Sequence, residues 1–232
     1  MNATTTAIHT AADLARAFDV SRETSGRLEV YADLLRQWQR VQNLVAPSTL
    51  DVLWGRHMAD SLQLLALAPE ARTWLDLGSG AGFPGMVIAI ALAEVGALAD
   101  ATGTRVHLVE SNARKCAFLA EVARKTRAPV EIHGDRIEFL VEKRRIESVD
   151  VVTARALAPL AKLLGFAHPF LGPATRCLFL KGRDADAEIE EARGTWHFDV
   201  STIPSRTDEH GRILVLSSVK PTDRADRSIQ KE

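Results

Sequence analysis

The stretch that decides the fold is Thr-Trp-Leu-Asp-Leu-Gly-Ser-Gly-Ala-Gly-Phe-Pro-Gly, residues 73 to 85. It opens with a short apolar run that one acid, Asp76, interrupts. Glycines then stand at positions 78, 80, 82 and 85. An apolar run that can form a helix follows from Met86. A buried strand, a glycine-rich turn and a helix are typical of nucleotide-binding α/β folds, because glycine allows positive φ and a close approach of the backbone to a ligand.

The glycine spacing and the acid favour one class of ligand. A dinucleotide fingerprint has its third glycine three positions after the second, whereas here the third is Gly82, two positions after Gly80. Asp76 places a carboxylate at the end of the strand, which suits an ammonium-bearing ligand better than a pyrophosphate. S-adenosylmethionine has an amino-acid end and no phosphate, so we expect it to bind at Asp76, Gly78 and Gly80. The alternatives are another nucleotide, or a turn that only reverses the chain.

Composition bounds the remaining possibilities. The 232 residues predict one large domain or one domain with a helical extension, and the charges nearly balance, with 29 Lys and Arg against 30 Asp and Glu. Nucleic-acid binding would therefore need a local basic patch. Cys116 and Cys177 lack disulfide or metal spacing, so we expect reduced thiols and no metal site. We find no secretion signal and no run of the ~18 apolar residues that a membrane span needs, so we expect a cytoplasmic protein without a membrane partner.

The chain is organised in two parts. Residues from about Thr10 to Leu67 have helical spacing, interrupted at Pro47, and strands alternate with helices from Thr73 onward. The expected strands are 73–77, 105–110, 129–133, 149–153, 175–181, about 197–203 and 212–219. The expected helices are about 85–95, 112–126, 136–145, 157–167 and 184–192. We predict an α/β fold: a doubly wound, mostly parallel seven-stranded sheet of the S-adenosylmethionine-dependent methyltransferase type, with one antiparallel edge strand and an N-terminal helical extension. The expected divisions are 1–67 for the extension, 68–220 for the core and 221–232 for a polar tail.

Ligands of such sheets bind at the carboxyl ends of the strands, and charged residues stand there. Glu110 stands at the end of the second strand, where it can accept hydrogen bonds from ribose hydroxyls. Ile137 and Glu138 follow the third strand, at the turn that borders adenine in methyltransferases. Arg155 ends the fourth strand and needs an anionic or aromatic partner. Lys181 ends the fifth. The two glutamates can instead be helix-start acids, and Lys181 a solvated rim residue.

Several segments resemble one known family. They are Gln-Asn-Leu-Val at 42–45, Arg-His-Met-Ala-Asp-Ser at 56–61, the glycine stretch at 76–85, Arg-Lys-Cys-Ala-Phe-Leu at 114–119, Arg-Ile-Glu at 136–138, Arg-Ala at 155–156 and Lys-Gly at 181–182. With these, the chain resembles the RsmG/GidB family of bacterial 16S ribosomal RNA guanine-N7 methyltransferases. The segment from Glu94 to Thr104 is longer than this resemblance leads us to expect.

The resemblance implies a site and a reaction. It implies S-adenosylmethionine contacts at Gly78, Phe83, Ile137, Glu138 and Arg155, with S-adenosylhomocysteine as product. The implied target is N7 of the 530-loop guanine, position 527 of the RNA, in 16S ribosomal RNA within or assembling into the small ribosomal subunit.

The chemistry of this target needs few protein groups. Guanine N7 has an in-plane lone pair and no proton to lose, so we expect alignment of the reactants and assign no catalytic acid or base. The candidates for substrate contact are Arg56, His57, Asp60 and Lys181. The first three can equally form a hydrogen-bond network between helices. A small-molecule methyltransferase and a non-catalytic S-adenosylmethionine-binding protein remain alternatives, because fold does not fix substrate.

Overall fold

The computed structural model describes residues 8–98, 103–142, 146 and 149–222. Its centre is a seven-stranded sheet with the order β3-β2-β1-β4-β5-β7-β6. The strands are β1 (Thr73–Leu77), β2 (Arg105–Val109), β3 (Val130–His133), β4 (Val149–Arg155), β5 (Leu171–Lys181), β6 (Trp196–Pro204) and β7 (Arg212–Pro221). The first five strands pair in parallel, and β7 runs antiparallel to both β5 and β6. The predicted mostly parallel seven-stranded sheet with one antiparallel strand is confirmed, but that strand, β7, lies one place inside the edge, and β6 is the edge strand.

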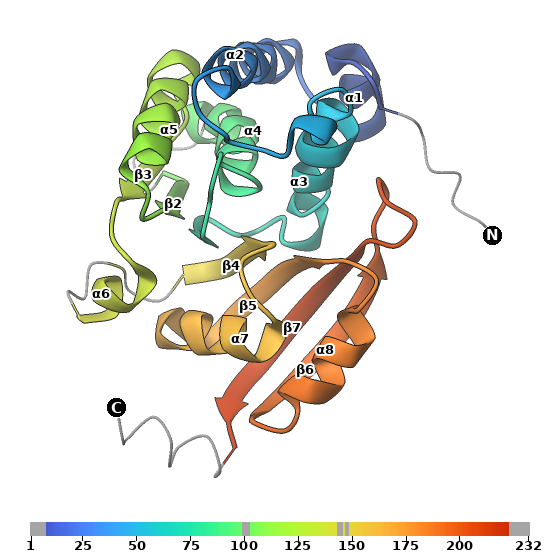
Figure 1. Cartoon of the computed structure of the whole chain (residues 1–232), viewed down its shortest axis with the longest axis vertical. Helices are drawn as coiled ribbons and strands as arrows, with labels where there is room; N and C mark the ends of the chain where they lie inside the picture. Colours follow the sequence, from blue (N-terminus) through green and yellow to red (C-terminus); the bar gives the residue numbers. More distant parts are fainter. Residues whose placement is uncertain (1–7, 99–102, 143–145, 147–148, 223–232) are drawn as a thin grey trace.

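The helices cover both faces of the sheet (Figure 1). One layer contains α1 (Ala11–Phe18), α2 (Arg22–Gln39), α3 (Asp60–Leu62), α4 (Gly85–Leu98) and α5 (Ala113–Thr126). The other contains α6 (Ile137–Glu142), α7 (Leu160–Ala167) and α8 (Ala185–Ala192). Each layer forms its own buried cluster against its face of the sheet. In the first cluster, Leu28 and Tyr31 of α2 are packed together with Phe118 of α5. The N-terminal helices therefore share one core with the sheet.

The second half of the N-terminal helical segment is irregular. Short 3₁₀ turns at Pro47–Thr49 and Leu65–Leu67 flank a turn of π-helix, Trp54–Ala59, which leads into α3. The backbone N–H of Asp60 donates to the carbonyl of Gly55, the i to i−5 bond of a wide turn. Single π turns are frequent at functional sites. Two of the predicted substrate residues, Arg56 and His57, lie on this turn, and a third, Asp60, follows it as the first residue of α3.

The glycine turn is fixed from below by a buried carboxylate. Asp76 at the end of β1 is fully buried; its Oδ2 accepts from the backbone N–H of Gly85 at 3.1 Å and its Oδ1 from the Thr153 hydroxyl at 2.9 Å. Burial raises the pKa of Asp76 to about 6, although these hydrogen bonds oppose the shift. Asp76 thereby joins β1 to the first residue of α4 and to the neighbouring strand β4.

The expected divisions of the chain stay predictions. Residues 1–7 of the extension and residues 223–232 of the predicted polar tail lie outside the described residues. Pro221 belongs to β7. Of the unusually long segment from Glu94 to Thr104, residues 99–102 also lie outside them.

Two glycine substitutions test this packing. In Gly85→Ala the new Cβ would meet Leu108 and would lie 2.7 Å from Cβ and 2.8 Å from Oδ2 of Asp76, so we expect a loss of about 1–3 kcal/mol in the free energy of unfolding. At Gly26, inside α2, an added Cβ would have no atom within 4 Å, and Gly26→Ala should add up to about 1 kcal/mol. Urea unfolding of both variants measures this, and a Gly85→Ala variant as stable as the parent would contradict the packing described.

Candidate functional site

Two cavities lie at the carboxyl ends of the parallel strands. The first, here the glycine-loop cavity, measures about 350 Å³. It is lined by Gly78, Gly80, Val109, Glu110, Ser111, Lys115, Asp135, Arg136, Ile137, Glu138, Ala156, Leu157 and Phe166. The structure thus brings together five predicted cofactor residues, from segments up to 60 positions apart in the sequence: Gly78, Gly80, Glu110, Ile137 and Glu138.

Glu110 is held in place by the turns around it. Its Oε2 accepts from the backbone N–H of Gly80 at 3.0 Å, and its Oε1 from that of Asn112 at 2.8 Å. Gly78 and Gly80 both have positive φ, 66° and 59°, a conformation that costs glycine nothing. The carboxylate, which has two acceptor oxygens with several lone pairs, therefore faces the cavity in a fixed orientation.

Three predicted cofactor residues lie outside this lining. Asp76 is beneath the turn, with both oxygens engaged as described above. Phe83 is buried in an aromatic stack, between Tyr31 at 5.3 Å and His57 at 4.7 Å between ring centroids. Arg155 lies over the Phe83 ring at 5.1 Å and lines a second cavity. In the structure, Asp76 and Phe83 therefore lie beneath and beside the glycine turn, and a cofactor contact at either residue stays a prediction.

Arg155 is fixed by the N-terminal π turn. Its Nη2 donates to Nδ1 of His57 at 2.7 Å, and its Nη1 donates to the Arg56 carbonyl at 3.1 Å. Because the guanidinium can only donate, His57 accepts at Nδ1 and carries its proton on Nε2, which donates to the Thr49 hydroxyl at 2.8 Å. The anionic or aromatic partner expected for Arg155 is the Phe83 ring, with the Asp60 carboxylate 3.7 Å away.

His57 is thereby kept neutral. Burial, followed by the charges of Arg155 and Arg56, lowers its pKa to about 3. At neutral pH this imidazole is a hydrogen-bond acceptor for Arg155. It is unsuited to proton transfer, which needs a pKa near the working pH.

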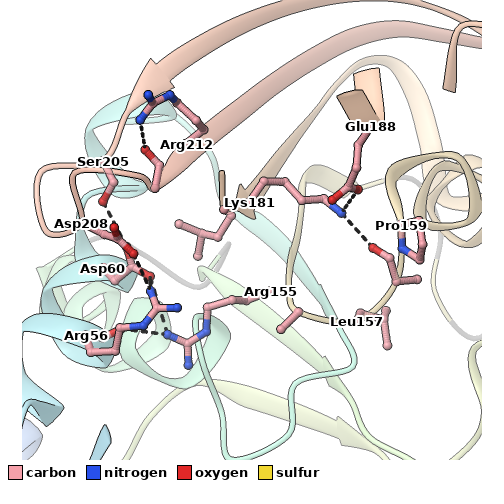
Figure 2. A pocket seen from close by; sticks show the side chains of 15 residues that line it. Arg56, Asp60, Arg155, Leu157, Pro159, Lys181, Glu188, Ser205, Asp208 and Arg212 are labelled. Atoms are coloured by element: carbon pink, nitrogen blue, oxygen red, sulfur yellow. Dashed lines mark hydrogen bonds and ion pairs between the residues drawn. The ribbon is translucent and has the colours of Figure 1, made fainter. Parts of the chain in front are cut away.

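The second cavity, here the Arg155 cavity, measures about 370 Å³ (Figure 2). It is lined by Arg56, Asp60, Arg155, Ala156, Leu157, Ala158, Pro159, Leu180, Lys181, Gly182, Glu188, Ser205, Asp208, Gly211 and Arg212. Three of the four predicted substrate residues, Arg56, Asp60 and Lys181, line this cavity. The fourth, His57, is outside the lining and contacts Arg155. Ala156 and Leu157 line both cavities, so this short segment borders the two spaces.

Asp60 is a buried hub of this cavity wall. Its Oδ1 accepts from Gln63 at 2.8 Å and from the Thr207 hydroxyl at 2.9 Å. Its Oδ2 lies 3.6 Å from Arg56 and 3.7 Å from Arg155. The sequence allowed a hydrogen-bond network as an alternative to substrate contact for these residues. Such a network is present, and it joins the π turn and Asp60 to the β6–β7 loop.

Lys181 holds the segment that separates the cavities. Its Nζ donates to the Ala158 carbonyl at 2.8 Å and pairs with Oε2 of Glu188 at 2.6 Å, and the same oxygen accepts from the backbone N–H of Leu160 at 2.7 Å. Ala156 has a positive φ of 53°, which is strained for an alanine. Strain of this kind collects at functional sites, where the surrounding contacts maintain it.

Several residues that line the Arg155 cavity were not predicted from the sequence. Leu157 and Glu188 carried no motif of their own, and Asp208 and Arg212 follow β6, the strand farthest from β1 on that side of the sheet. The signal that could have found Asp208 is a cluster of polar residues in a hairpin loop beside the cleft. The predicted strands alone did not show that this loop contacts the N-terminal helical segment at Arg56 and Asp60.

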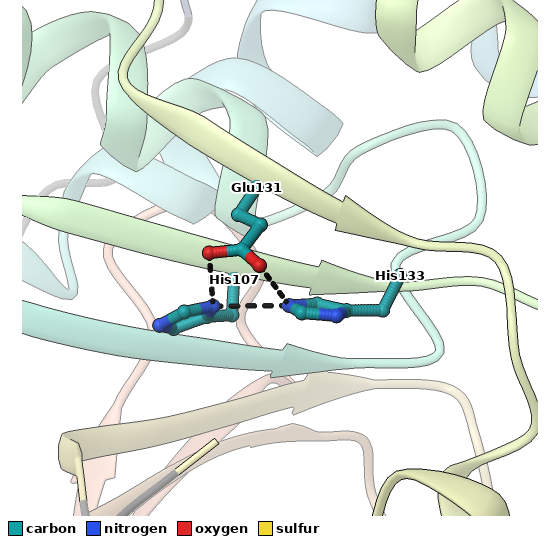
Figure 3. Close-up of side chains that lie close together, drawn as sticks. All are labelled: His107, Glu131 and His133. Carbon is teal, nitrogen blue, oxygen red and sulfur yellow. Dashed lines mark hydrogen bonds and ion pairs between the residues drawn. The ribbon is translucent and has the colours of Figure 1, made fainter. Parts of the chain in front are cut away.

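One further cluster could hold a metal ion. On β2 and β3, the side chains of His107, Glu131 and His133 bring their donor atoms within 4.8 Å of one another (Figure 3). Nδ1 of His107 and Nε2 of His133 are 3.0 Å apart while the ring centroids are 5.2 Å apart, so the two nitrogens point at each other in a hydrogen bond. Burial, with the neighbouring His133, lowers the pKa of His107 to about 4. A metal ion would have to replace this hydrogen bond.

Within the described residues, the structure holds no helix that is both long and apolar enough to cross a membrane.

Comparison with protein families gives a match over most of the chain. The family described as rRNA small subunit methyltransferase G matches residues 25–213. The chain belongs to this family.

Curated relatives carry the same description. A protein of Methylorubrum populi named ribosomal RNA small subunit methyltransferase G is 53% identical over 205 residues, which cover 88% of this chain and 93% of the relative. One of Rhodopseudomonas palustris with the same name is 49% identical over 222 residues, 93% of this chain and 90% of the relative.

Solved structures share the fold at low identity. A putative O-methyltransferase from Klebsiella pneumoniae has a TM-score of 0.59 at 14% identity, over 90% of this chain and 97% of that one. A methyltransferase from Geobacter sulfurreducens has a TM-score of 0.55 at 14% identity, over 83% and 90%. The methyltransferase-type sheet predicted from the sequence is thereby confirmed.

The neutral state of His57 predicts a pH dependence of stability. Its pKa is about 3 in the folded chain and about 6.5 when unfolded, so the unfolded chain takes up the proton first as pH falls below about 6.5. We expect His57 to cost stability progressively between about pH 6.5 and 3, by at most about 1.4 kcal/mol per pH unit.

His57→Gln, whose side-chain oxygen can still accept from Arg155, isolates this effect. Asp76 acts in the opposite direction: its raised pKa of about 6 adds stability as pH falls through that value, but equally in both proteins. The parent's advantage in the free energy of unfolding should therefore shrink between pH 7 and pH 4. A constant difference in urea unfolding over this range would contradict a neutral, buried His57.

Proposed function

We propose that this chain transfers the methyl group of S-adenosylmethionine to ribosomal RNA of the small subunit, at N7 of a guanine in the 530 loop of 16S RNA. The observation that carries the proposal is the pair of neighbouring cavities that share Ala156 and Leu157 in their linings. One has the residues for an adenosyl ligand, and the other is bordered by the cations Arg56, Arg155 and Arg212. The family description and the names of the relatives support RNA of the small subunit as substrate. The guanine, its N7 atom and the loop rest on the family resemblance.

The glycine-loop cavity fits S-adenosylmethionine. Glu110 offers carboxylate oxygens to ribose hydroxyls, and the backbone at Gly78 and Gly80 leaves room for the ligand to approach. Val109, Ile137 and Phe166 supply apolar surface for adenine. We assign these residues and Glu138 to the cofactor.

The proposed methyl transfer requires that N7, the methyl carbon and the sulfur lie in line. When bound, S-adenosylmethionine supplies a methyl carbon that the N7 lone pair can attack while the carbon–sulfur bond breaks and sulfur keeps the electron pair. N7 loses no proton, which agrees with a neutral His57 that cannot act as a base at neutral pH. The protein's task is to hold N7 at the junction of the two cavities, and orientation of this kind can supply several kcal/mol of a barrier.

Some residues of the Arg155 cavity are available to contact the target nucleotide, and others hold neighbouring parts of the protein in place. Arg56 has a side chain 46% exposed, so it can reach RNA, while the Lys181 side chain is only 8% exposed and is paired with Glu188. We therefore assign Arg56 and Arg155 to the target nucleotide. Lys181 holds the Ala156–Pro159 segment, and the substrate contact expected for it becomes indirect. A nearly neutral chain with a local cationic cavity suits a structured RNA recognised by shape and local contacts.

The experiment that tests the function is methylation of small ribosomal subunits from cells that lack this activity. Incubation with S-adenosylmethionine labelled in its methyl group should label 16S RNA at one guanine, and mapping should find 7-methylguanine in the 530 loop. Label on another base or atom would contradict the finer assignment. Label on a small metabolite only would favour the small-molecule alternative. Cofactor binding without any transfer would favour the non-catalytic one.

Glu110 tests the cofactor site. Glu110→Gln keeps the shape and one acceptor oxygen but loses the charge, and we expect S-adenosylmethionine and S-adenosylhomocysteine to bind less tightly by about 1.5–3 kcal/mol each, because both carry the ribose. Calorimetry measures the loss. Glu190→Gln, at an exposed acid of α8 outside both cavity linings, is the control. Normal affinity for both ligands in Glu110→Gln would remove Glu110 from the site.

A substitution at Arg155 distinguishes a role in binding the cofactor from a role in binding the target nucleotide. Its position in the second cavity predicts that Arg155→Ala keeps S-adenosylhomocysteine affinity within about threefold, roughly 0.65 kcal/mol, and loses methyl transfer to small subunits by about 10²-fold or more, on the order of 3 kcal/mol. The sequence resemblance instead implies a direct cofactor contact. A large loss of S-adenosylhomocysteine affinity in a folded Arg155→Ala chain would support that contact and contradict the assignment to the target nucleotide.

A further inference from the structure

The acids of the Arg155 cavity are not equally available to a ligand. Among the described residues, three carboxylates line it: Asp60, Glu188 and Asp208. Asp60 is buried and serves as the hub already described, with one oxygen filled by hydrogen bonds and the other facing two guanidinium groups. Glu188 is held by Lys181 and by the first backbone N–H of α7.

Asp208 has a different environment. Its side chain is 34% exposed, and its Oδ1 accepts from the backbone N–H of His210 at 2.9 Å. Its Oδ2 lies 3.7 Å from Nη1 of Arg56, which is an ion pair longer than a hydrogen bond. Asp208 therefore keeps acceptor capacity on the side that faces the cavity (Figure 2).

The loop that carries Asp208 is anchored on both sides of it. Thr207 donates from its hydroxyl to Asp60 at 2.9 Å, and the backbone N–H of Arg206 donates to Oε1 of Gln63 at 3.0 Å. After Asp208, the backbone N–H of Gly211 donates back to its carbonyl at 3.0 Å. A carboxylate held by its neighbours loses less conformational entropy when it binds, and this suits selective recognition.

The two sides of the cavity match the two edges of a guanine. Figure 2 places Asp208 and Leu157 on opposite sides, with Arg155 between them. If N7 faces the junction at Leu157, the N1–H and 2-amino donors point to the other side of the purine. The intervening O6 is an acceptor that an arginine can meet. Adenine has an acceptor at N1 and no 2-amino group, so it would present a lone pair to the carboxylate.

We propose that Asp208 is the residue that selects guanine, by accepting hydrogen bonds from N1–H and the 2-amino group of the target base. This inference rests on the proposed function, since it takes the Arg155 cavity to be the site of the target nucleotide. It adds a specificity-determining residue from a loop that the sequence motifs do not include.

Nucleotide binding tests the proposal without turnover. The full chain, saturated with S-adenosylhomocysteine so that adenosyl sites are filled, is titrated by NMR with the 5′-monophosphates of guanosine, inosine and adenosine. Inosine keeps N1–H but lacks the 2-amino group. We expect guanosine monophosphate to bind roughly tenfold more tightly than inosine monophosphate, the scale of one hydrogen bond to a charged acceptor, and adenosine monophosphate to bind most weakly.

Asp208→Asn should reduce the preference for guanosine over inosine monophosphate to within about twofold, because the amide keeps the shape and the acceptor for His210. Glu209→Gln, at the adjacent acid outside the cavity lining, is the control and should keep the parent's ranking. A parent chain that does not rank guanosine monophosphate first, or an Asp208→Asn chain that keeps the full preference, would overturn the proposal.

Methylation of small subunits separates this proposal from the function itself. Asp208→Asn should lower kcat/KM for small subunits by about tenfold or more with unchanged S-adenosylhomocysteine affinity. A parent chain that ranks guanosine monophosphate first but methylates no ribosomal RNA would contradict the function and leave the base selection standing. An Asp208→Asn chain that methylates small subunits at the parent's rate would contradict the selection alone.

Discussion

The hydrogen bond from Arg155 to His57 is the contact on which the site depends, because it joins the sheet to the N-terminal helical segment. Arg155 ends β4, and His57 lies on the π turn, 98 positions earlier. The bond requires a neutral imidazole with its proton on Nε2, and burial beside two arginines enforces that state. Phe83 of the glycine turn packs against both side chains. These contacts therefore hold the glycine turn, the end of β4 and the π turn in fixed positions relative to one another.

Two buried carboxylates, Asp76 and Asp60, connect this region to other parts of the fold. Asp76 ties the glycine turn to α4 and to β4, so the floor of the first cavity is fixed by the sheet itself. Asp60 ties the π turn to the β6–β7 loop, so the wall of the second cavity is fixed by parts of the chain 147 positions apart. Lys181 and Glu188 hold the strained segment at Ala156 that both cavities share. The two cavities border the same short segment, Ala156 and Leu157, so molecules bound in them would lie on either side of it.

Much of this could be predicted from the sequence, and the limits have physical causes. Local periodicity indicates strands and helices, and parallel strands place their carboxyl ends together, so the positions of Glu110 and Ile137 at one cavity followed directly. Hydrogen bonds between distant segments have no such periodicity. The sequence could not show that Asp76 uses its oxygens to bind Gly85 and Thr153, or that Lys181 is paired with Glu188. Asp208 was missed because its loop is held at the cavity by contacts with Arg56, Asp60 and Gln63, which are distant in the sequence.

We expect a cofactor in the glycine-loop cavity to present its reacting atom to the Arg155 cavity beside Ala156 and Leu157. A crystal structure of the chain with S-adenosylhomocysteine tests it most directly. We expect the ribose hydroxyls to lie on the Glu110 carboxylate, the adenine to lie against Ile137, and the sulfur to lie next to Ala156 and Leu157, facing Arg155. A ligand that binds elsewhere, or whose sulfur faces away from the Arg155 cavity, would contradict it.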